Sequence, residues 1–382
     1  MASIKILATI SRVAGLMLLA GFGTSVVVSC LSGDISSNAS QQTAQQPLFA
    51  DAQGSPVPLE GGPGKVLVGD MNNDRKLDLV VALGRPRAIT VLEGKGNGQF
   101  GPALSTTTIA EPPSEIAAGD FNGDGKLDVA ISSHDSYGVV LLNGDGKGGL
   151  AKAPASPVVM KLGQHPHTHG LAVADINRDN KLDLITCNNE DNDISIAFGD
   201  GRGNFTRAPQ PFPVGPSPYP FAVGDVNNDG YPDIVATASA TGPFRREQLP
   251  KSRALTLLLS DGKGGLSPRQ LPIRTGEPWF AAIADLNHDG KPDIVATHHE
   301  LNALTVMIGD DRDGFTEANG SPFDFGISLF ELVIADVDGD KTMDVVATNG
   351  NSIRVLSGDG RGGFRQSASI PVGSGAWRIT AA

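Results

Sequence analysis

From residue 48 onward, short apolar stretches alternate with turns that are rich in Gly, Asp and Asn. In the first unit, residues 66–69, 77–83 and 88–93 are apolar stretches of strand length, and residues 102–109 close the unit. None of these stretches repeats its apolar residues at helical spacing, so the pattern predicts four β-strands in about fifty residues. We therefore expect an all-β fold over this region.

One loop motif recurs six times in this region, and its first Asp residues are spaced by 50 to 60 residues. The loop carries Asp or Asn at positions 1, 3, 5 and 9, in the six sets Asp70, Asn72, Asp74 and Asp78; Asp120, Asn122, Asp124 and Asp128; Asp175, Asn177, Asp179 and Asp183; Asp225, Asn227, Asp229 and Asp233; Asp285, Asn287, Asp289 and Asp293; and Asp336, Asp338, Asp340 and Asp344. A Gly-rich turn that ends in a large apolar residue, such as residues 144–150 (GDGKGGL), follows each loop. A four-stranded unit is too small to bury its own faces, so the units must stack, and radial stacking makes a β-propeller.

The D-x-N-x-D-G-x-x-D loop with its downstream G-D-G-x-G-G-F turn resembles the FG-GAP/VCBS repeat. The resemblance covers residues 48–382. It implies the calcium-bearing β-propeller that forms the head of integrin α subunits and occurs in many bacterial surface proteins. It also implies that ligands bind at the end of the propeller opposite the Asp loops.

The two ends of this region predict how the ring closes. Residues 49–57 are similar to residues 315–323 and resemble the last strand of a repeat, whereas residues 371–382 are similar to residues 213–224 and resemble a first strand. We therefore favour a seven-bladed plan, with six full repeats and a seventh blade that holds only its first and last strands. Closure with six blades and two spare strands is the alternative.

The Asp loops offer hard oxygen ligands in a short turn. Side-chain oxygens stand at positions 1, 3, 5 and 9, and position 7 can add a backbone carbonyl. Ca²⁺ takes about six to eight oxygens at ~2.3–2.6 Å, whereas softer metals prefer Cys or His. We expect up to six structural Ca²⁺ ions, each joining the first two strands of a blade. In the alternative, these residues only shape Asx-type turns.

The N-terminal segment has a different pattern. Lys5 and Arg12 accompany an apolar run at residues 13–28, and Cys30 ends a sequence (VVSC) that resembles a bacterial lipobox. The predicted organisation is a signal peptide over residues 1–29, a lipidated Cys30 that anchors the chain to a membrane, a flexible tether over residues 30–47, and a single propeller domain over residues 48–382. Plain secretion and a retained anchor helix are the alternatives. All three place the protein outside the cytoplasm, as an outer-membrane or cell-surface lipoprotein or as a secreted protein.

In a four-stranded meander, successive loops alternate between the two ends of the blade. Histidines and aromatic residues gather at the end opposite the Asp loops, and this candidate ligand face holds His134, His165, His167, His169, Tyr219, Trp279, His298, His299, Glu300 and Trp377. In the run at residues 164–169 (QHPHTH), an extended backbone turns the imidazoles to one side. Sugars stack on aromatic rings, and imidazoles bind transition metals or titrate near neutral pH. Alternatively, the aromatics are core residues between blades and the histidines lie on a solvated loop.

Charge and composition exclude several classes of function. The formal net charge of −12 argues against nucleic-acid binding, and two cysteines exclude a disulfide framework or a Cys-rich zinc site. The preferred interpretation is a non-enzymatic, calcium-stabilised propeller that binds a protein or carbohydrate at the cell surface, as an adhesion module does. One alternative is a metal-assisted hydrolase or lyase on the histidine face, although the sequence holds no HExxH or nucleophile-elbow motif and we assign no catalytic residues. The other is an envelope scaffold. The fourth repeat carries a basic insertion at residues 238–253. This insertion is a candidate loop for contacting a partner, and a solvated loop is the alternative.

Overall fold

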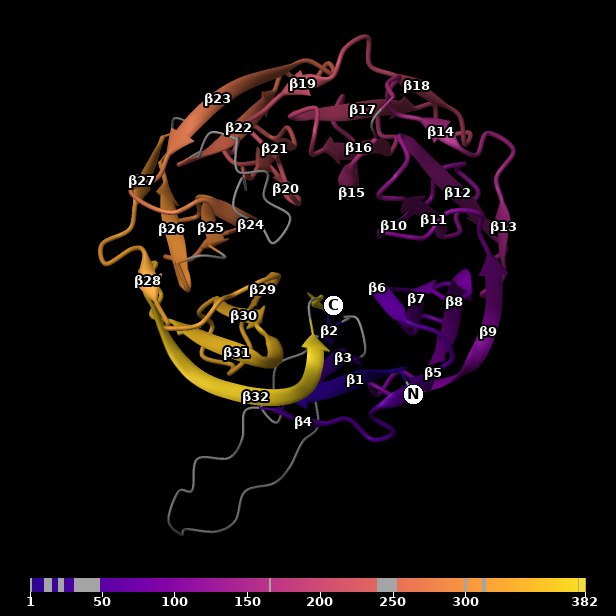
Figure 1. Cartoon of the computed structure of the whole chain (residues 1–382), viewed down its shortest axis with the longest axis horizontal. Helices are drawn as coiled ribbons and strands as arrows, with labels where there is room; N and C mark the ends of the chain where they lie inside the picture. The colour runs from indigo at the N-terminus through magenta and orange to yellow at the C-terminus, as the bar shows by residue number, and fades with distance from the viewer. Residues whose placement is uncertain are drawn as a thin grey trace.

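The computed structural model describes residues 2–9, 16–19, 24–30, 49–164, 166–238, 253–298, 301–310, 314–376 and 378–381. Over these residues, every element of regular structure is a β-strand, as expected (Figure 1). The parts of our predictions that lie outside the described residues are His165, His299, Glu300, Trp377, residues 1, 10–15 and 20–23 of the predicted signal peptide, residues 31–47 of the tether and residues 239–252 of the insertion. No helix in the described part of the chain has the length and apolar character that a membrane span requires.

Six antiparallel blades, one from each repeat, form over the described residues and surround a central axis (Figure 1). The first blade holds β6 (Pro63–Gly69), β7 (Asp78–Gly84), β8 (Arg87–Gly94) and β9 (Phe100–Thr108), and the second holds β10 (Glu115–Gly119), β11 (Asp128–Ser132), β12 (Gly138–Gly144), β13 (Leu150–Lys152) and β14 (Val158–Val159). The third holds β15 (Thr168–Ala174), β16 (Asp183–Asn188), β17 (Asp193–Gly199), β18 (Phe205–Arg207) and β19 (Phe212–Pro213), and the fourth holds β20 (Phe221–Gly224), β21 (Asp233–Ala236), β22 (Ala254–Ser260) and β23 (Leu266–Pro272). The fifth holds β24 (Pro278–Ala284), β25 (Asp293–His298), β26 (Ala303–Gly309), β27 (Phe315–Glu317) and β28 (Phe323–Asp324), and the sixth holds β29 (Leu332–Ala335), β30 (Asp344–Thr348), β31 (Gly350–Gly358) and β32 (Phe364–Ala376).

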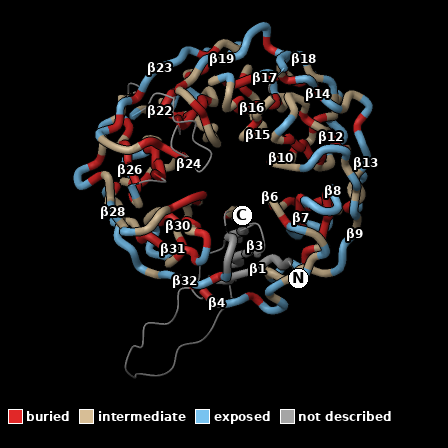
Figure 2. The backbone as a smooth tube through the Cα atoms, viewed as in Figure 1, coloured by how far each residue is buried: buried red, intermediate tan, exposed pale blue. Residues whose placement is uncertain are grey.

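The core of the protein lies between blades. In each blade the first strand lies nearest the axis and the last lies at the rim (Figure 1). The second and third strands are the most buried, and every residue of β16 is buried, whereas the rim strand β9 is mostly exposed (Figure 2). Apolar side chains of neighbouring blades share clusters, such as Val80 and Ile89 of the first blade with Val129 and Leu142 of the second. This sharing is expected of units that cannot bury their own faces.

The last Asp of each loop ties its blade together. Asp183 shows the pattern, because it is wholly buried, its Oδ2 accepts the amide of Ile176 at 2.9 Å, and its Oδ1 accepts the amide of Gly199 at 2.9 Å. The same pair of bonds, at 2.7 to 3.0 Å, recurs at Asp78, Asp128, Asp233, Asp293 and Asp344. We call these contacts the buried Asp clamps. Each clamp joins an Asp loop to the start of the following Gly-rich turn, which explains why the two motifs occur as a pair.

The ring closes differently from the plan that we favoured. The six repeats form six blades over the described residues, so the seven-bladed plan is wrong and the six-bladed alternative fits. The segment predicted to be the first strand of a seventh blade is divided. Its residues 371–376 extend β32, where Ala376 pairs with Gly350, and only β33 (Thr380–Ala381) departs from the sixth blade. Strand β31 pairs with this extension, so half of the predicted strand is not available to a further blade.

A further sheet, built from strands outside the six repeats, lies between the sixth and first blades. Its strand order is β33–β2–β3–β1–β4, from β2 (Leu16–Leu19), β3 (Thr24–Cys30), β1 (Ala2–Thr9) and β4 (Phe49–Asp51), and β5 (Val57–Leu59) also pairs with β1. Strand β3 contacts β32, and β1 contacts β6, so this sheet occupies the space between the last and first blades (Figure 1). Strands β1, β2 and most of β3 lie within residues 1–29, which we predict to be a signal peptide. The structure is that of the uncleaved chain, so cleavage stays a prediction.

Candidate functional site on the innermost strands

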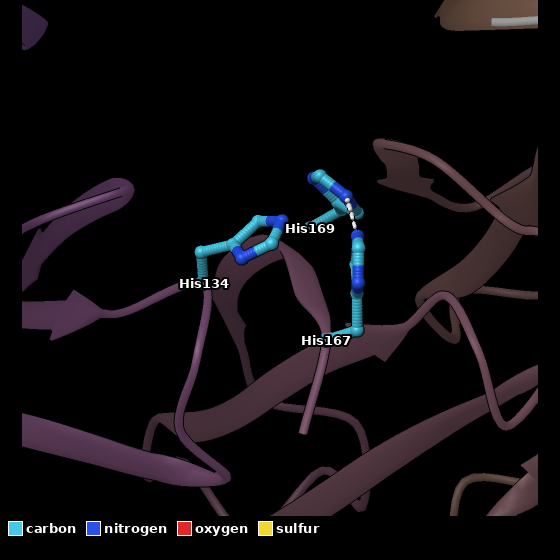
Figure 3. A group of neighbouring side chains, drawn as sticks. All are labelled: His134, His167 and His169. Atoms are coloured by element: carbon cyan, nitrogen blue, oxygen red, sulfur yellow. Dashed lines mark hydrogen bonds between the residues drawn. The ribbon is translucent and has the colours of Figure 1, made fainter. Parts of the chain in front are cut away.

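Three histidines meet where the second and third blades adjoin (Figure 3). His134 follows β11, whereas His167 and His169 flank Thr168 at the start of β15. Thr168 holds the two segments together, because its amide donates to the His134 carbonyl at 3.0 Å and its hydroxyl donates to the Ser136 carbonyl at 2.9 Å. His167 and His169 turn to the same side, as alternation in an extended backbone predicts. The neighbouring blade supplies the third ring.

The three imidazoles, which we call the histidine cluster, pack against one another. Ring centroids lie 4.0 Å apart for His134 and His167, 4.5 Å for His167 and His169, and 4.9 Å for His134 and His169. The Nε2 atoms of His167 and His169 are 2.7 Å apart, and one ring nitrogen from each histidine lies within 4.8 Å of the others. Two carboxylates face outer nitrogens: Asp135 Oδ1 is 2.6 Å from His134 Nδ1, and Glu190 Oε1 is 3.3 Å from His167 Nδ1.

Burial keeps the two inner histidines neutral. Burial, reinforced by the neighbouring His167 and His134, lowers the pKa of His169 to about 2. Burial also lowers the pKa of His167, and His134 adds to this effect while Glu190 opposes it. Both rings therefore keep a nitrogen lone pair at neutral pH, which is the form of imidazole that binds metals.

A row of stacked rings continues from the histidine cluster along the inner strands. The ring centroid of Tyr219, just before β20, lies 4.4 Å from that of His169, and the centroid of Trp279 in β24 lies 4.5 Å from that of Tyr219. We call these three residues the aromatic row, and it joins the third, fourth and fifth blades. Trp279 is only 8% exposed and packs mainly in the core, whereas Tyr219 is half-buried. Tyr219 is therefore the better placed of the two to contact a ligand.

Two other residues with chemically reactive side chains, His298 and Cys187, belong to the core. His298, which we placed on the candidate ligand face, is wholly buried in the fifth blade, and its Nε2 lies 2.7 Å from Thr305 Oγ1. Burial lowers the pKa of His298 to about 4. Cys187 is also wholly buried, and burial raises the pKa of its thiol. Both side chains contribute to packing rather than to an open site.

Four charged side chains link the first, second and sixth blades near the axis. Lys65 Nζ lies 2.6 Å from Glu331 Oε1 and 3.1 Å from Glu115 Oε2, and Arg378 Nη2 lies 2.8 Å from Glu115 Oε1. We call this group the buried ion network. Burial disfavours the charge on Lys65, but the two carboxylates outweigh it and raise the pKa of the amine. Burial likewise disfavours the charge on Glu115, but Arg378 and Lys65 hold its pKa below the usual value.

The sequence motifs do not reveal this network. Its members are far apart in the chain, and Lys65 and Glu331 are separated by 266 positions. One signal was available, because Lys65, Glu115 and Glu331 all stand within or beside the apolar first strand of their repeats. A charge in such a position needs a partner, and the first strands of different blades converge near the axis.

The loop oxygens at positions 1, 3 and 5 lie together at the surface. In the second loop, Asp120 and Asn122 both accept the amide of Asp124, at 3.2 and 2.9 Å, which is an Asx-type arrangement. In the sixth loop, one carboxylate oxygen from each acidic residue lies within 4.8 Å of the other two, in the set Asp336, Asp338 and Asp340. These hard oxygens fit Ca²⁺. The Asp at position 9 is less available as a ligand, because both of its oxygens accept backbone amides in the buried Asp clamps.

The family of FG-GAP-like repeats matches the chain at residues 70–131, 120–186 and 175–236. These three matches contain the first four Asp loops and the strands beside them. No curated protein sequence matches the chain.

Solved structures share the fold at low sequence identity. A lectin of Agrocybe aegerita that specifically recognises non-reducing terminal N-acetylglucosamine is 16% identical, with a TM-score of 0.61 over 98% of each chain. The periplasmic gluconolactonase of Pseudomonas aeruginosa is 15% identical, with a TM-score of 0.61 over 96% of this chain and 99% of that one. A protein from Lactobacillus plantarum is 13% identical, with a TM-score of 0.67 over 97% of this chain and 100% of that one. At these identities the likeness shows the fold alone.

Proposed function

The chain is an FG-GAP-repeat β-propeller, and from this premise we propose that it is an extracytoplasmic module that binds a carbohydrate at its histidine-bearing end. The observation that carries the proposal is the aromatic row beside the histidine cluster. Sugars place their apolar faces against aromatic rings, and the phenol of Tyr219 and the imidazoles add hydrogen-bonding groups. The names of the lectin and the gluconolactonase point to sugar chemistry on this fold, which favours a carbohydrate over a protein ligand.

Calorimetric titration of the purified chain with N-acetylglucosamine, glucose and oligomers of each tests this proposal. We expect at least one sugar to bind, and Tyr219→Leu to weaken that binding at least tenfold. Tyr231→Leu is the matched control. Tyr231 lies in the fourth Asp loop, at the opposite end of the blades, where the guanidinium of Arg178 from the third loop lies over its ring. Thermal melts show whether either variant is unfolded. Absence of sugar binding by the wild type, or equal binding by Tyr219→Leu, would contradict the proposal.

Up to six structural Ca²⁺ ions stabilise this module by binding in the Asp loops. The support is the grouping of three carboxylates in the sixth loop and of a carboxylate and an amide oxygen around the Asp124 amide in the second loop, because Ca²⁺ prefers such hard oxygens. A thermal melt in excess calcium and then in chelator, combined with elemental analysis, measures the effect. We expect the melting temperature to fall by many degrees in chelator. If no calcium is bound and the melt does not shift, the loops are Asx-type turns only.

Residues 1–29 direct export in this proposal, and Cys30 is lipidated and anchors the chain to a membrane at the cell surface. Cleavage before Cys30 removes β1, β2 and all but the last residue of β3, while the six repeat blades keep all their strands. Mass spectrometry of the protein from an expressing bacterium tests this, with a diacylated Cys30 as the expected first residue. Cys30→Ser should prevent lipidation. An uncleaved N-terminus would contradict export by this route.

The histidine cluster favours one second candidate, a metal-assisted hydrolase or lyase on the same face. A divalent metal held by imidazoles supplies an activated water at neutral pH. Turnover of sugar lactones and oligosaccharides by the wild type and by His167→Ala separates this candidate from a binding module. Metal-dependent turnover that His167→Ala abolishes without lowering the melting temperature supports an enzyme. Binding without turnover supports the first proposal.

A further inference from the structure

The histidine cluster has the construction of a metal site. His134 turns Nδ1 towards Asp135 and His167 turns Nδ1 towards Glu190, so each ring leaves Nε2 for another partner. Nε2 of His167 faces Nε2 of His169, and the three rings converge from two blades (Figure 3). Metal-binding histidines usually contact a carboxylate, carbonyl or water through their second nitrogen, which sets the tautomer and fixes the ring. Two of the three rings here have such a carboxylate.

The spacing of the nitrogens suits a small divalent ion. Zn²⁺ binds imidazole at about 2.0–2.1 Å in a tetrahedral arrangement, which places neighbouring ligand nitrogens roughly 3.3 Å apart. In the cluster, one pair of nitrogens is 2.7 Å apart and all three lie within 4.8 Å of one another, so the required separation falls inside the observed range. Small rotations of the rings are enough to reach it. The backbone bond between Thr168 and His134 already fixes the distance between the two blades.

We infer that His134, His167 and His169 form a mononuclear site for a late first-row divalent metal ion, with Zn²⁺ as its first occupant. Three imidazoles are ligands that Zn²⁺ and its neighbours in the series prefer, whereas Ca²⁺ prefers the oxygens of the Asp loops. The two kinds of site lie at opposite ends of β11, because the second Asp loop precedes this strand and His134 follows it. Three protein ligands leave one position of a tetrahedral ion for water or a ligand oxygen.

Zinc titration of the untagged, full-length chain tests this inference. The buffer holds excess calcium, so that the Asp loops are occupied by their preferred ion. Isothermal calorimetry should show one Zn²⁺ per chain with a dissociation constant below about 1 μM, and Co²⁺ should give the intense visible bands of a tetrahedral site. His167→Ala and His134→Ala should each weaken binding at least 100-fold. Glu190→Gln should weaken it about 10- to 100-fold, as loss of a partner to a metal-binding imidazole does.

His288→Asn is the matched control, because His288 is exposed in the fifth Asp loop and Asn tolerates its φ of 62°. This variant should bind zinc like the wild type. His134 is 44% exposed on a loop, so His134→Ala should fold even if His167→Ala does not. No stoichiometric zinc in the wild type, or unchanged zinc affinity in His134→Ala, would overturn the inference. Sugar binding is measured separately through Tyr219→Leu, so failure of the metal site and failure of the proposed function are distinguishable.

Discussion

Replacement of Asp183 by Ala removes one buried Asp clamp from the third blade. The carboxylate is wholly buried, and it accepts the amides of Ile176 and Gly199, both at 2.9 Å. A methyl group accepts neither bond, so two buried N–H groups lose their partner. Each such group costs roughly 1–3 kcal/mol, and the pair therefore costs roughly 2–6 kcal/mol of the free energy of unfolding. Domains are usually stable by only about 5–15 kcal/mol, so this loss is large.

Asp200→Ala is the matched control in the same blade. Asp200 also accepts two backbone amides, from Arg202 at 2.8 Å and from Asn204 at 3.1 Å, but it is exposed. Water can therefore replace the lost acceptor, and the cost should stay within about 0.5 kcal/mol. Both variants lose two bonds from backbone amides, and Asp200→Ala also loses an exposed bond from Asn204 Nδ2 at 2.9 Å. A larger loss for Asp183→Ala, which gives up fewer bonds, therefore measures the effect of burial on the clamp.

Urea unfolding of both variants, followed by far-ultraviolet circular dichroism, measures the two losses in calcium and in chelator. A loss for Asp183→Ala that persists in chelator belongs to the clamp, whereas a loss confined to calcium buffer assigns Asp183 to ion binding. Equal losses for Asp183→Ala and Asp200→Ala in chelator would refute the reasoning.

The pH dependence of the same pair gives an independent check. Burial raises the pKa of Asp183 to about 6 from the usual 3.8, against the opposing effect of its two amide bonds. Between pH 3.8 and pH 6 the folded chain holds a proton on Asp183 that the unfolded chain has lost. The titration of Asp183 therefore adds stability as the pH falls below about 6, and this added stability is lost as the pH rises through 6. The difference in stability between the wild type and Asp183→Ala should therefore be larger at pH 5 than at pH 7. A difference that shrinks towards pH 5 would contradict the assigned pKa.

Two further substitutions test the buried ion network and the core histidine. Lys65→Met leaves Glu115 and Glu331 buried with one cation fewer and should cost about 3–5 kcal/mol in urea unfolding. Lys95→Met, which breaks an exposed ion pair, should cost less than about 1 kcal/mol, and similar losses would count against the network. Burial lowers the pKa of His298 from 6.5 to about 4, so the unfolded chain alone gains this proton as the pH falls from 6.5 to 4, and the fold loses stability over that range. His298→Asn should lose less stability than the wild type over the same pH range, and an identical pH profile would show that another group titrates.

Much of the fold was predictable because its signals are local. Alternation of short apolar stretches with Asp and Gly turns predicts strands and loops, and recurrence of the paired motifs predicts stacked four-stranded units. The role of Asp183 as a clamp was less accessible, because the position-9 Asp looks like any other oxygen ligand in the loop. Its burial becomes evident only when the loop and the Gly-rich turn lie side by side in one blade.

The sequence by itself determined the number of repeats, the β-strand character, the place of every Asp loop and the end of the blades at which His134, His167 and His169 lie. These depend on turn chemistry and on hydrophobic periodicity within about fifty residues. Only the tertiary structure decided that β32 takes up residues 371–376 and that six repeat blades form. It also decided that His134 meets His167 and His169 across two blades, and that Lys65 meets Glu331. The physical reason is that convergence at the axis depends on the angle between stacked blades, which packing between their faces sets, and no single repeat contains it.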